Sequence, residues 1–251
     1  MKDPSAHGRD PIEEVMAELQ ACLDALPPRL EHHRVFVATY RRTTAAVGAA
    51  AADGMFEDRG WVERWDVAFA GLYLAALRAE LADGRPSRPW RVAFAAPPET
   101  PALRQLLFGI NAHVNYDLPQ SLLATITDAE FADPALMASR RRDHERIDTV
   151  LASRVSAEDA ELGGRRRLLD RLLTPANRQA SRRFLREARL KVWHNTVELQ
   201  SARLAGPEAY DRRLAELEVL SAAKIADLQA PGQVLLRLAV AGFGVTLPPP
   251  G

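Results

Sequence analysis

The chain has 251 residues, 47% hydrophobic and 26% charged, with a formal net charge of zero, which is typical of a folded protein large enough to bury a core. The neutral balance lacks the positive field that gathers nucleic acid, and the single cysteine, Cys22, excludes an internal disulfide or a cysteine-based zinc site. No stretch resembles a signal peptide or approaches about 18 uninterrupted apolar residues, so we expect a cytoplasmic protein without a membrane partner.

Alanine, leucine, arginine and glutamate dominate, and alternating β-branched runs are nearly absent, which predicts an all-α protein. Capping residues precede prolines at 10–11, 100–101, 133–134 and 174–175, and Ser156 with Asp159 resembles a capping box. The predicted helices span residues 11–26, 30–52, 59–82, 88–95, 101–117, 119–127, 134–155, 157–173, 175–205, 208–229 and 231–241. Because the connections are short, we expect a single-domain multi-helix bundle over residues 1–251, with 1–9 and 246–251 as loose tails.

Two of the first helices place polar side chains on the face that should be buried. In the helix predicted over 30–52, His33, Tyr40 and Thr44 align with apolar neighbours. In the helix predicted over 59–82, Asp66 shares its face with Tyr73. A residue in a helix turns by about 100° from its predecessor, so these groups point inward together.

The clearest case is the stretch LLFGINAHVNYDLP, residues 106–119. His113 and Asp117 fall on the apolar stripe of this helix, with Asn111 and Asn115 on its flank. A buried carboxylate has to be paired, hydrogen-bonded or bound to metal, and at this spacing the two side chains could share a ligand or a proton. Two structural interpretations stay open beside the functional one: Asp117 could cap the next helix, and His113 could be a satisfied core histidine.

The same spacing recurs at His144 and Asp148 in the helix predicted over 134–155. One inward polar residue is usually a hydrogen-bonded exception, whereas several on different helices indicate a shared site. We therefore expect an interior cavity lined by polar side chains.

Three segments, FEDRGWVERWDVAFAGLYLAAL, GINAHVNYDLPQSL and RRRDHERIDTVL, resemble a bacterial, largely actinobacterial, family of all-helical domains of unknown function over roughly residues 30–200. The Asn-Ala-His-x-Asn-x-Asp-Leu-Pro motif of that family is matched by Asn111, Ala112, His113, Asn115, Asp117, Leu118 and Pro119. Its acidic-aromatic helix is matched by Asp58, Trp65, Asp66, Phe69 and Tyr73. The resemblance implies a helical fold whose motif lines a pocket, and it implies no particular activity. His144 departs from the pattern, where a less polar residue is expected.

Sequence motifs for dinucleotide binding, phosphate-binding loops, hydrolase nucleophiles, aspartate-rich terpene synthases and His-Glu-x-x-His zinc sites are absent. We expect a small-molecule enzyme in which His113 performs acid/base chemistry, Asp117 orients it and Asp66 supplies a second carboxylate. The substrate would be mainly apolar and would undergo cyclisation, isomerisation or elimination, as in secondary metabolism. The candidate substrate-binding residues are Tyr73, Trp65, Phe69, Asn111, Asn115, Tyr40 and His33.

Two alternatives stay open. A divalent metal held by His113, Asp117 and Asp66, joined by His144 and Asp148, would support a hydrolase or oxidase, because imidazole and carboxylate suit zinc, iron or manganese. A non-enzymatic helical protein that binds a small ligand in the cavity is the third possibility. The cofactor is therefore either absent or a divalent metal, and the sequence leaves the oligomeric state open.

Overall fold

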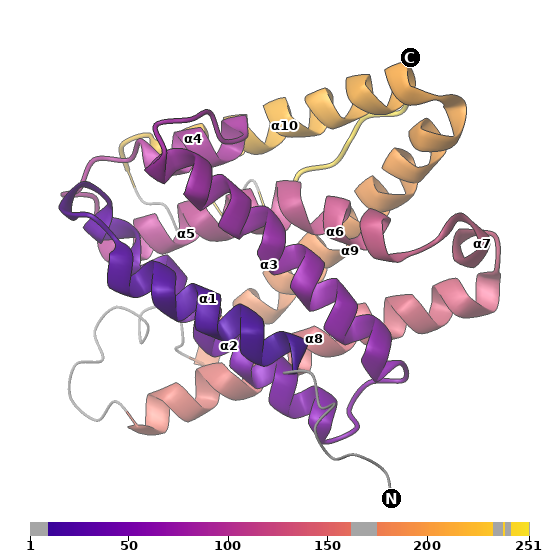
Figure 1. Cartoon of the computed structure of the whole chain (residues 1–251), viewed down its shortest axis with the longest axis horizontal. Helices are drawn as coiled ribbons and strands as arrows, with labels where there is room; N and C mark the ends of the chain where they lie inside the picture. Colours follow the sequence, from indigo (N-terminus) through magenta and orange to yellow (C-terminus); the bar gives the residue numbers. More distant parts are fainter. Residues whose placement is uncertain (1–9, 162–174, 233–237, 239–241, 251) are drawn as a thin grey trace, which may run out of the picture.

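A computed structural model describes residues 10–161, 175–232, 238 and 242–250, and these residues form helices and no strand (Figure 1). The all-α class predicted from composition is confirmed. The elements are α1 (Pro11–Ala25), the 3₁₀ helix η1 (Pro28–His33), α2 (Arg34–Ala52), α3 (Arg59–Leu81), α4 (Arg88–Phe94), α5 (Ala102–Ala112), the π-helix η2 (His113–Asp117), α6 (Leu118–Thr125), α7 (Asp128–Phe131), α8 (Pro134–Glu161), α9 (Pro175–Ala205) and α10 (Pro207–Gln229).

Capping residues begin two helices where they were predicted. Asp10 accepts a hydrogen bond from the N–H of Ile12 at the start of α1, and Asp133 accepts from Ala135 and Leu136 at the start of α8. These bonds satisfy N–H groups that have no partner inside their own helix. At α5 the predicted cap at residue 100 is wrong, because Pro101 occupies the N-cap and makes no side-chain bond.

The boundary predicted at Ser156 is also wrong, since α8 runs unbroken from Pro134 to Glu161. Neither proline nor glycine interrupts it there, and serine costs a helix interior only a few tenths of a kcal/mol. The remainder of the helix predicted over 157–173, and most of that predicted over 231–241, lies outside the described residues. The short helix α7, which a capping box between Thr127 and Glu130 begins, was not predicted.

One continuous helical run from Ala102 to Thr125, made of α5, η2 and α6, lies in the middle of the molecule. Helices α2 and α3 pack against it, as do α9 and α10 (Figure 1). The prediction of two helices separated near Asp117 is corrected by the π-helical turn. Pro119 has no N–H and its ring would collide with the carbonyl four residues earlier, and a wider turn relieves this, with the N–H of Leu118 donating five residues back to His113.

The C-terminal segment 242–250 is held against the protein up to Leu247, so the loose tail predicted from residue 246 is attached at this residue, whereas residues 246 and 248–250 are exposed. Leu247 is 1% exposed and its N–H donates to Asn195 Oδ1 at 2.8 Å. Arg213 donates to the carbonyl of Pro248 at 2.7 Å. The prolines exclude a helix here, but their carbonyls still accept hydrogen bonds, so side chains of α9 and α10 hold the segment. In the part of the chain that the structure describes, no helix combines the length and apolarity needed to cross a lipid bilayer.

Candidate functional site

His113, Asp117 and Trp90 form a hydrogen-bonded chain inside the protein, called here the relay. Nδ1 of His113 lies 2.9 Å from Oδ2 of Asp117, and Trp90 Nε1 donates to the same oxygen at 2.8 Å. All three are buried. Because this oxygen acts as the acceptor, His113 carries its proton on Nδ1 and presents a lone pair at Nε2. Burial lowers the pKa of His113, although the hydrogen bond and charge of Asp117 oppose the shift, so the ring is neutral at pH 7.

The π-helical turn η2 carries both ends of the His113–Asp117 pair. Asp117 stands at the N-cap position of α6 yet makes no capping bond with its side chain. The capping interpretation is therefore wrong, because the carboxylate is turned toward Trp90 and His113 instead. Burial raises the pKa of Asp117, while its hydrogen bond and charge interaction with His113 and the hydrogen bond from Trp90 act in the opposite direction. Turns of this kind are frequently found at functional sites.

Five aromatic rings surround the imidazole of His113, with centroids between 3.6 and 6.1 Å from it. This aromatic cage consists of Phe36, Tyr40, Phe69, Tyr73 and Trp90. Phe69 stacks on the imidazole at 3.6 Å with 7° between the planes, and Tyr40 meets it edge-on at 4.6 Å. The surroundings of Nε2 are thus mainly apolar, which strengthens electrostatic interactions there.

Three polar atoms near the cage are buried without a hydrogen-bond partner: His113 Nε2, Asp66 Oδ2 and Tyr73 Oη. The hydroxyls of Tyr40 and Thr44 are buried beside them and interact with each other. Burial raises the pKa of Asp66 to about 7. Burial also raises the pKa of Tyr40, and the charges of Asp66 and Asp117 raise it further, so both carboxylates act on one hydroxyl. Buried polar groups normally have partners. Such a concentration of exceptions around one imidazole is unusual for a protein interior.

Four of the predicted substrate-binding residues lie outside the cage. His33 packs edge-on against Phe94, and Trp65 donates to Ser121 Oγ at 3.0 Å. Asn111 donates to a backbone carbonyl one turn earlier in α5. Asn115 donates to Asn111 and also to a carbonyl of the C-terminal segment. These two amides therefore connect the central run to the packed C-terminus.

The five predicted metal donors do not gather at one point, although His113 and Asp117 are in contact. His144 lies between the rings of Trp65 and Trp193, with centroids 5.5 and 5.7 Å away. Asp148 is paired with Arg189. Among residues whose positions are described, no three histidine, cysteine, aspartate or glutamate side chains lie where they could hold one metal ion. The placement of the donors therefore gives the metal-dependent alternative no support.

Sequence reasoning missed Trp90 and Phe36. Trp90 lies on α4, and its bond to Asp117 joins residues 27 apart in the chain, a contact that no local sequence pattern indicates. Phe36 lies directly over Gly109 of α5: a Cβ built there would be 2.4 Å from Phe36 Cδ2. A glycine inside an otherwise apolar helix was the available signal, because it permits such a close approach.

We expect Gly109→Ala to destabilise the protein by about 1–3 kcal/mol, because overpacking displaces the Phe36 ring and outweighs a gain in helix propensity of about 1 kcal/mol. Gly71→Ala in α3 is the matched control, since nothing lies within 4 Å of its added Cβ. Urea unfolding of both variants measures the difference. A Gly109→Ala protein as stable as Gly71→Ala would show that Phe36 is not fixed at this position.

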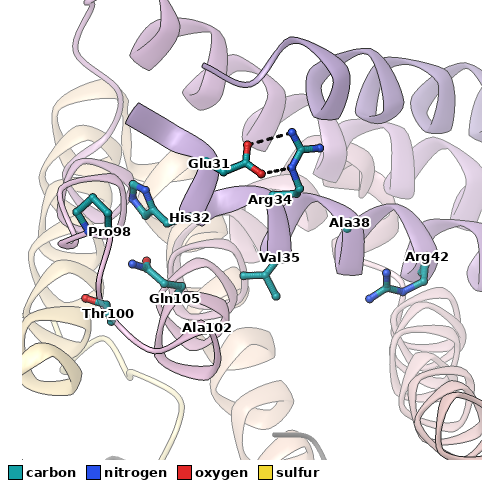
Figure 2. A pocket seen from close by; sticks show the side chains of 10 residues that line it. All are labelled: Glu31, His32, Arg34, Val35, Ala38, Arg42, Pro98, Thr100, Ala102 and Gln105. Atoms are coloured by element: carbon teal, nitrogen blue, oxygen red, sulfur yellow. Dashed lines mark hydrogen bonds and ion pairs between the residues drawn. The ribbon is translucent and has the colours of Figure 1, made fainter. Parts of the chain in front are cut away.

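A hollow of about 580 Å³ lies apart from the cage, between η1, the outer face of α2 and the start of α5 (Figure 2). His32, Pro98, Thr100 and Gln105 gather at one end of it, and Arg42 lies at the other. None of the cage residues lines it.

A family model described as a family of unknown function, DUF5995, matches residues 12–231, a span that includes the relay and the whole cage. No curated protein and no solved structure matches the chain. The family match confirms the resemblance to helical domains of unknown function. The chain belongs to this family of unknown function, DUF5995.

Proposed function

We propose that the protein is a small-molecule enzyme in which His113 is the general base. The observation that carries this proposal is the state of the imidazole: Nε2 is buried and has no partner, while Nδ1 is fixed by Asp117 and, through it, by Trp90. Nε2 of His144 is also buried without a partner, so the feature that distinguishes His113 is the carboxylate of Asp117 on its other nitrogen. An imidazole held by a carboxylate at one nitrogen and open at the other is the arrangement that proton abstraction requires.

The relay supports this chemistry in two ways. Asp117 fixes the tautomer with the lone pair on Nε2, and its negative charge stabilises the imidazolium that forms when Nε2 takes a proton. Trp90 holds the carboxylate in place through the oxygen that His113 also uses. Burial lowers the pKa of His113, so the free enzyme holds it in the neutral, basic form.

Asp66 is the proposed acid. A carboxyl group with a pKa of about 7 is partly protonated at neutral pH and can therefore donate a proton there. Tyr40 lies near both groups. The centroid of its ring is 4.6 Å from that of His113, and the charge of Asp66 raises the pKa of its hydroxyl. The hydroxyls of Tyr40 and Tyr73 are donors for negative charge that develops on the substrate.

One group that accepts a proton and another that donates one suit a reaction without a net redox change. Isomerisation or cyclisation moves a proton from one atom of the substrate to another, and elimination removes a proton and a protonated leaving group. The rings of the cage suit a mainly apolar substrate. A non-catalytic ligand-binding protein is the second candidate, and the surface hollow is the observation that favours it.

The test compares wild-type protein with His113→Ala in a bacterial metabolite extract analysed by mass spectrometry. We expect wild-type protein to convert at least one metabolite into an isomer or a dehydrated product. His113→Ala should slow this conversion by about 10²- to 10⁴-fold, the usual contribution of a general acid or base. Circular dichroism checks that the variant keeps its helices.

His144→Ala is the matched control, because His144 is equally buried and its Nε2 also has no partner, but it lies beside Trp65 and Trp193. It should retain the conversion. If wild-type protein changes no metabolite, or if His113→Ala works as well as wild type, the catalytic proposal is wrong.

A further inference from the structure

The C-terminal segment is bound through its backbone, as an extended peptide. Asn195 of α9 donates to the carbonyl of Val245 at 3.0 Å and accepts from the N–H of Leu247 at 2.8 Å. Asn115 of η2 repeats this pattern two residues earlier, since it donates to the carbonyl of Phe243 at 3.2 Å and accepts from the N–H of Val245 at 3.3 Å. Each side-chain amide thus binds a carbonyl and the N–H two residues later, as a residue of a neighbouring parallel strand does.

The segment also fits closely against the helices that hold it. Phe243 is 8% exposed and Leu247 is 1% exposed, so both side chains are part of the hydrophobic core. Lys191 of α9 donates to the carbonyl of Gly244 at 3.1 Å. Gly244 lies so near this helix that an added Cβ would be 3.1 Å from Cα of Ala188. The attachment can therefore be loosened at α9 without any change to the residues of η2.

Asn115 lies midway between the two relay residues of η2. Successive helical residues turn by about 100°, so its side chain leaves the turn on roughly the side opposite to His113 and Asp117. The side chain is 1% exposed, and its amide hydrogens are donated to Asn111 and to the C-terminal segment. The cage therefore contacts one side of the turn, and the C-terminal segment holds the other.

The geometry of the relay depends on this turn. The bond of 2.9 Å between His113 Nδ1 and Asp117 Oδ2 joins its first and last residues. If the C-terminal segment detached, Asn115 would lose two of its three hydrogen bonds, and an unsatisfied buried amide is costly. A π-helical turn is rare compared with an α-helical one, so a rearrangement that gave the amide new partners would readily alter it. The distance between the relay residues would change as well.

We propose that Asn115 is a positioning residue, through which the attached C-terminal segment keeps η2 in the geometry that bonds His113 to Asp117. It acts through the backbone of the turn, because its own hydrogen bonds go to Asn111 and to the segment. Detachment of the segment therefore leaves the helices in place and releases the fixed tautomer of His113. This inference deepens the proposed function and rests on it in treating His113 as the reacting group.

The test detaches the segment at α9 in the full chain. In Asn195→Ala, the N–H groups of Val245 and Leu247 should exchange with solvent about 10-fold faster, the worth of the lost hydrogen bonds. Nitrogen NMR shifts of the His113 imidazole give the tautomer. Wild-type protein should carry the proton on Nδ1, and the variant should move toward a mixture of the two tautomers. The variant should also convert metabolites more slowly than wild-type protein.

Gln200→Ala is the matched control, because Gln200 is a buried amide of the same helix that donates to Asp128 instead of the segment. It should leave the imidazole signals and the conversion unchanged. Gly244→Ala is a second way to loosen the segment, since its added Cβ would meet the backbone of α9. It should change the imidazole signals as Asn195→Ala does, and it replaces that variant if Asn195→Ala does not fold.

The inference is wrong if exchange at Val245 and Leu247 becomes faster while the imidazole signals stay as in wild-type protein. It is also wrong if neither variant speeds this exchange, if Gln200→Ala moves the signals equally, or if the loosened variants convert metabolites at the wild-type rate. Failure of the proposed function looks different: the imidazole signals respond as expected, while wild-type protein itself converts no metabolite.

Discussion

Replacing Asp66 by asparagine should make the protein more stable at pH 8 by about 4 kcal/mol, because burial raises the pKa of this carboxyl group from 3.8 to about 7. In the unfolded chain the group ionises near 3.8, whereas the folded protein holds the proton up to about pH 7. Over that interval the unfolded state binds fewer protons, so stability falls as the pH rises. The contribution of protonated Asp66 is fully present below pH 3.8 and is lost once the pH has passed through 7.

Asparagine has nearly the same shape as aspartic acid and does not ionise. The Asp66→Asn protein therefore keeps the stability that wild-type protein loses as the pH rises. Urea unfolding between pH 4 and pH 8 should show the two proteins converging at the acidic end. Asp128→Asn is the control, because Gln200 and Arg203 lower the pKa of Asp128 and the pH trend has the opposite sign. An Asp66→Asn protein no more stable than wild type at pH 8 would show that the carboxyl group is not held protonated by burial.

A buried carboxyl group that lowers the folding stability by this much at neutral pH is expected to serve the function of the protein. Active sites are where groups are kept in unfavourable surroundings so that their pKa suits proton transfer. Asp66 has the burial, the unpartnered oxygen and the raised pKa expected of such a group. The stability measurement therefore bears on function even before a substrate is known.

Local periodicity was enough to predict most helices and to place His113 and Asp117 on one buried face, because both depend on residues close in sequence. It was not enough to assign roles. His144 and Asp148 have the same spacing as His113 and Asp117, yet Asp148 is paired with Arg189 from another helix. Which partner reaches a side chain is decided by tertiary packing, and four-residue spacing carries no information about that.

The other differences between the predicted and the observed structure also arise from tertiary packing. The π-helical turn follows from Pro119 within a run that packing on both sides keeps helical, so the proline did not end the helix as local rules predicted. The C-terminal segment looked like a tail because it is rich in proline. Its order depends on Asn195 and Arg213, which lie some 50 and 35 residues away in the chain.

Substitutions at Asp117 measure how much the carboxylate of the relay contributes to stability, compared with an aspartate that caps a helix. Asp117→Ala leaves the buried donors of Trp90 and His113 without an acceptor, which should cost about 3–5 kcal/mol of stability. Asp117→Asn keeps an acceptor oxygen, so it should cost about 1 kcal/mol, the typical worth of the lost charge in a hydrogen bond. The pKa of His113 should fall further in the asparagine variant, because Asp117 at present raises it against the effect of burial.

Asp133→Ala provides the comparison, since Asp133 does cap α8 through two backbone N–H groups and its loss should cost about 1 kcal/mol. Urea unfolding at pH 7 ranks the three variants, and NMR titration of the imidazole follows His113. If Asp117→Ala costs no more than Asp133→Ala, the hydrogen bonds of the relay contribute no more to stability than an ordinary helix cap does. If the alanine variant is far less stable while the asparagine variant folds but loses conversion as His113→Ala does, the negative charge of Asp117 acts in the reaction through His113.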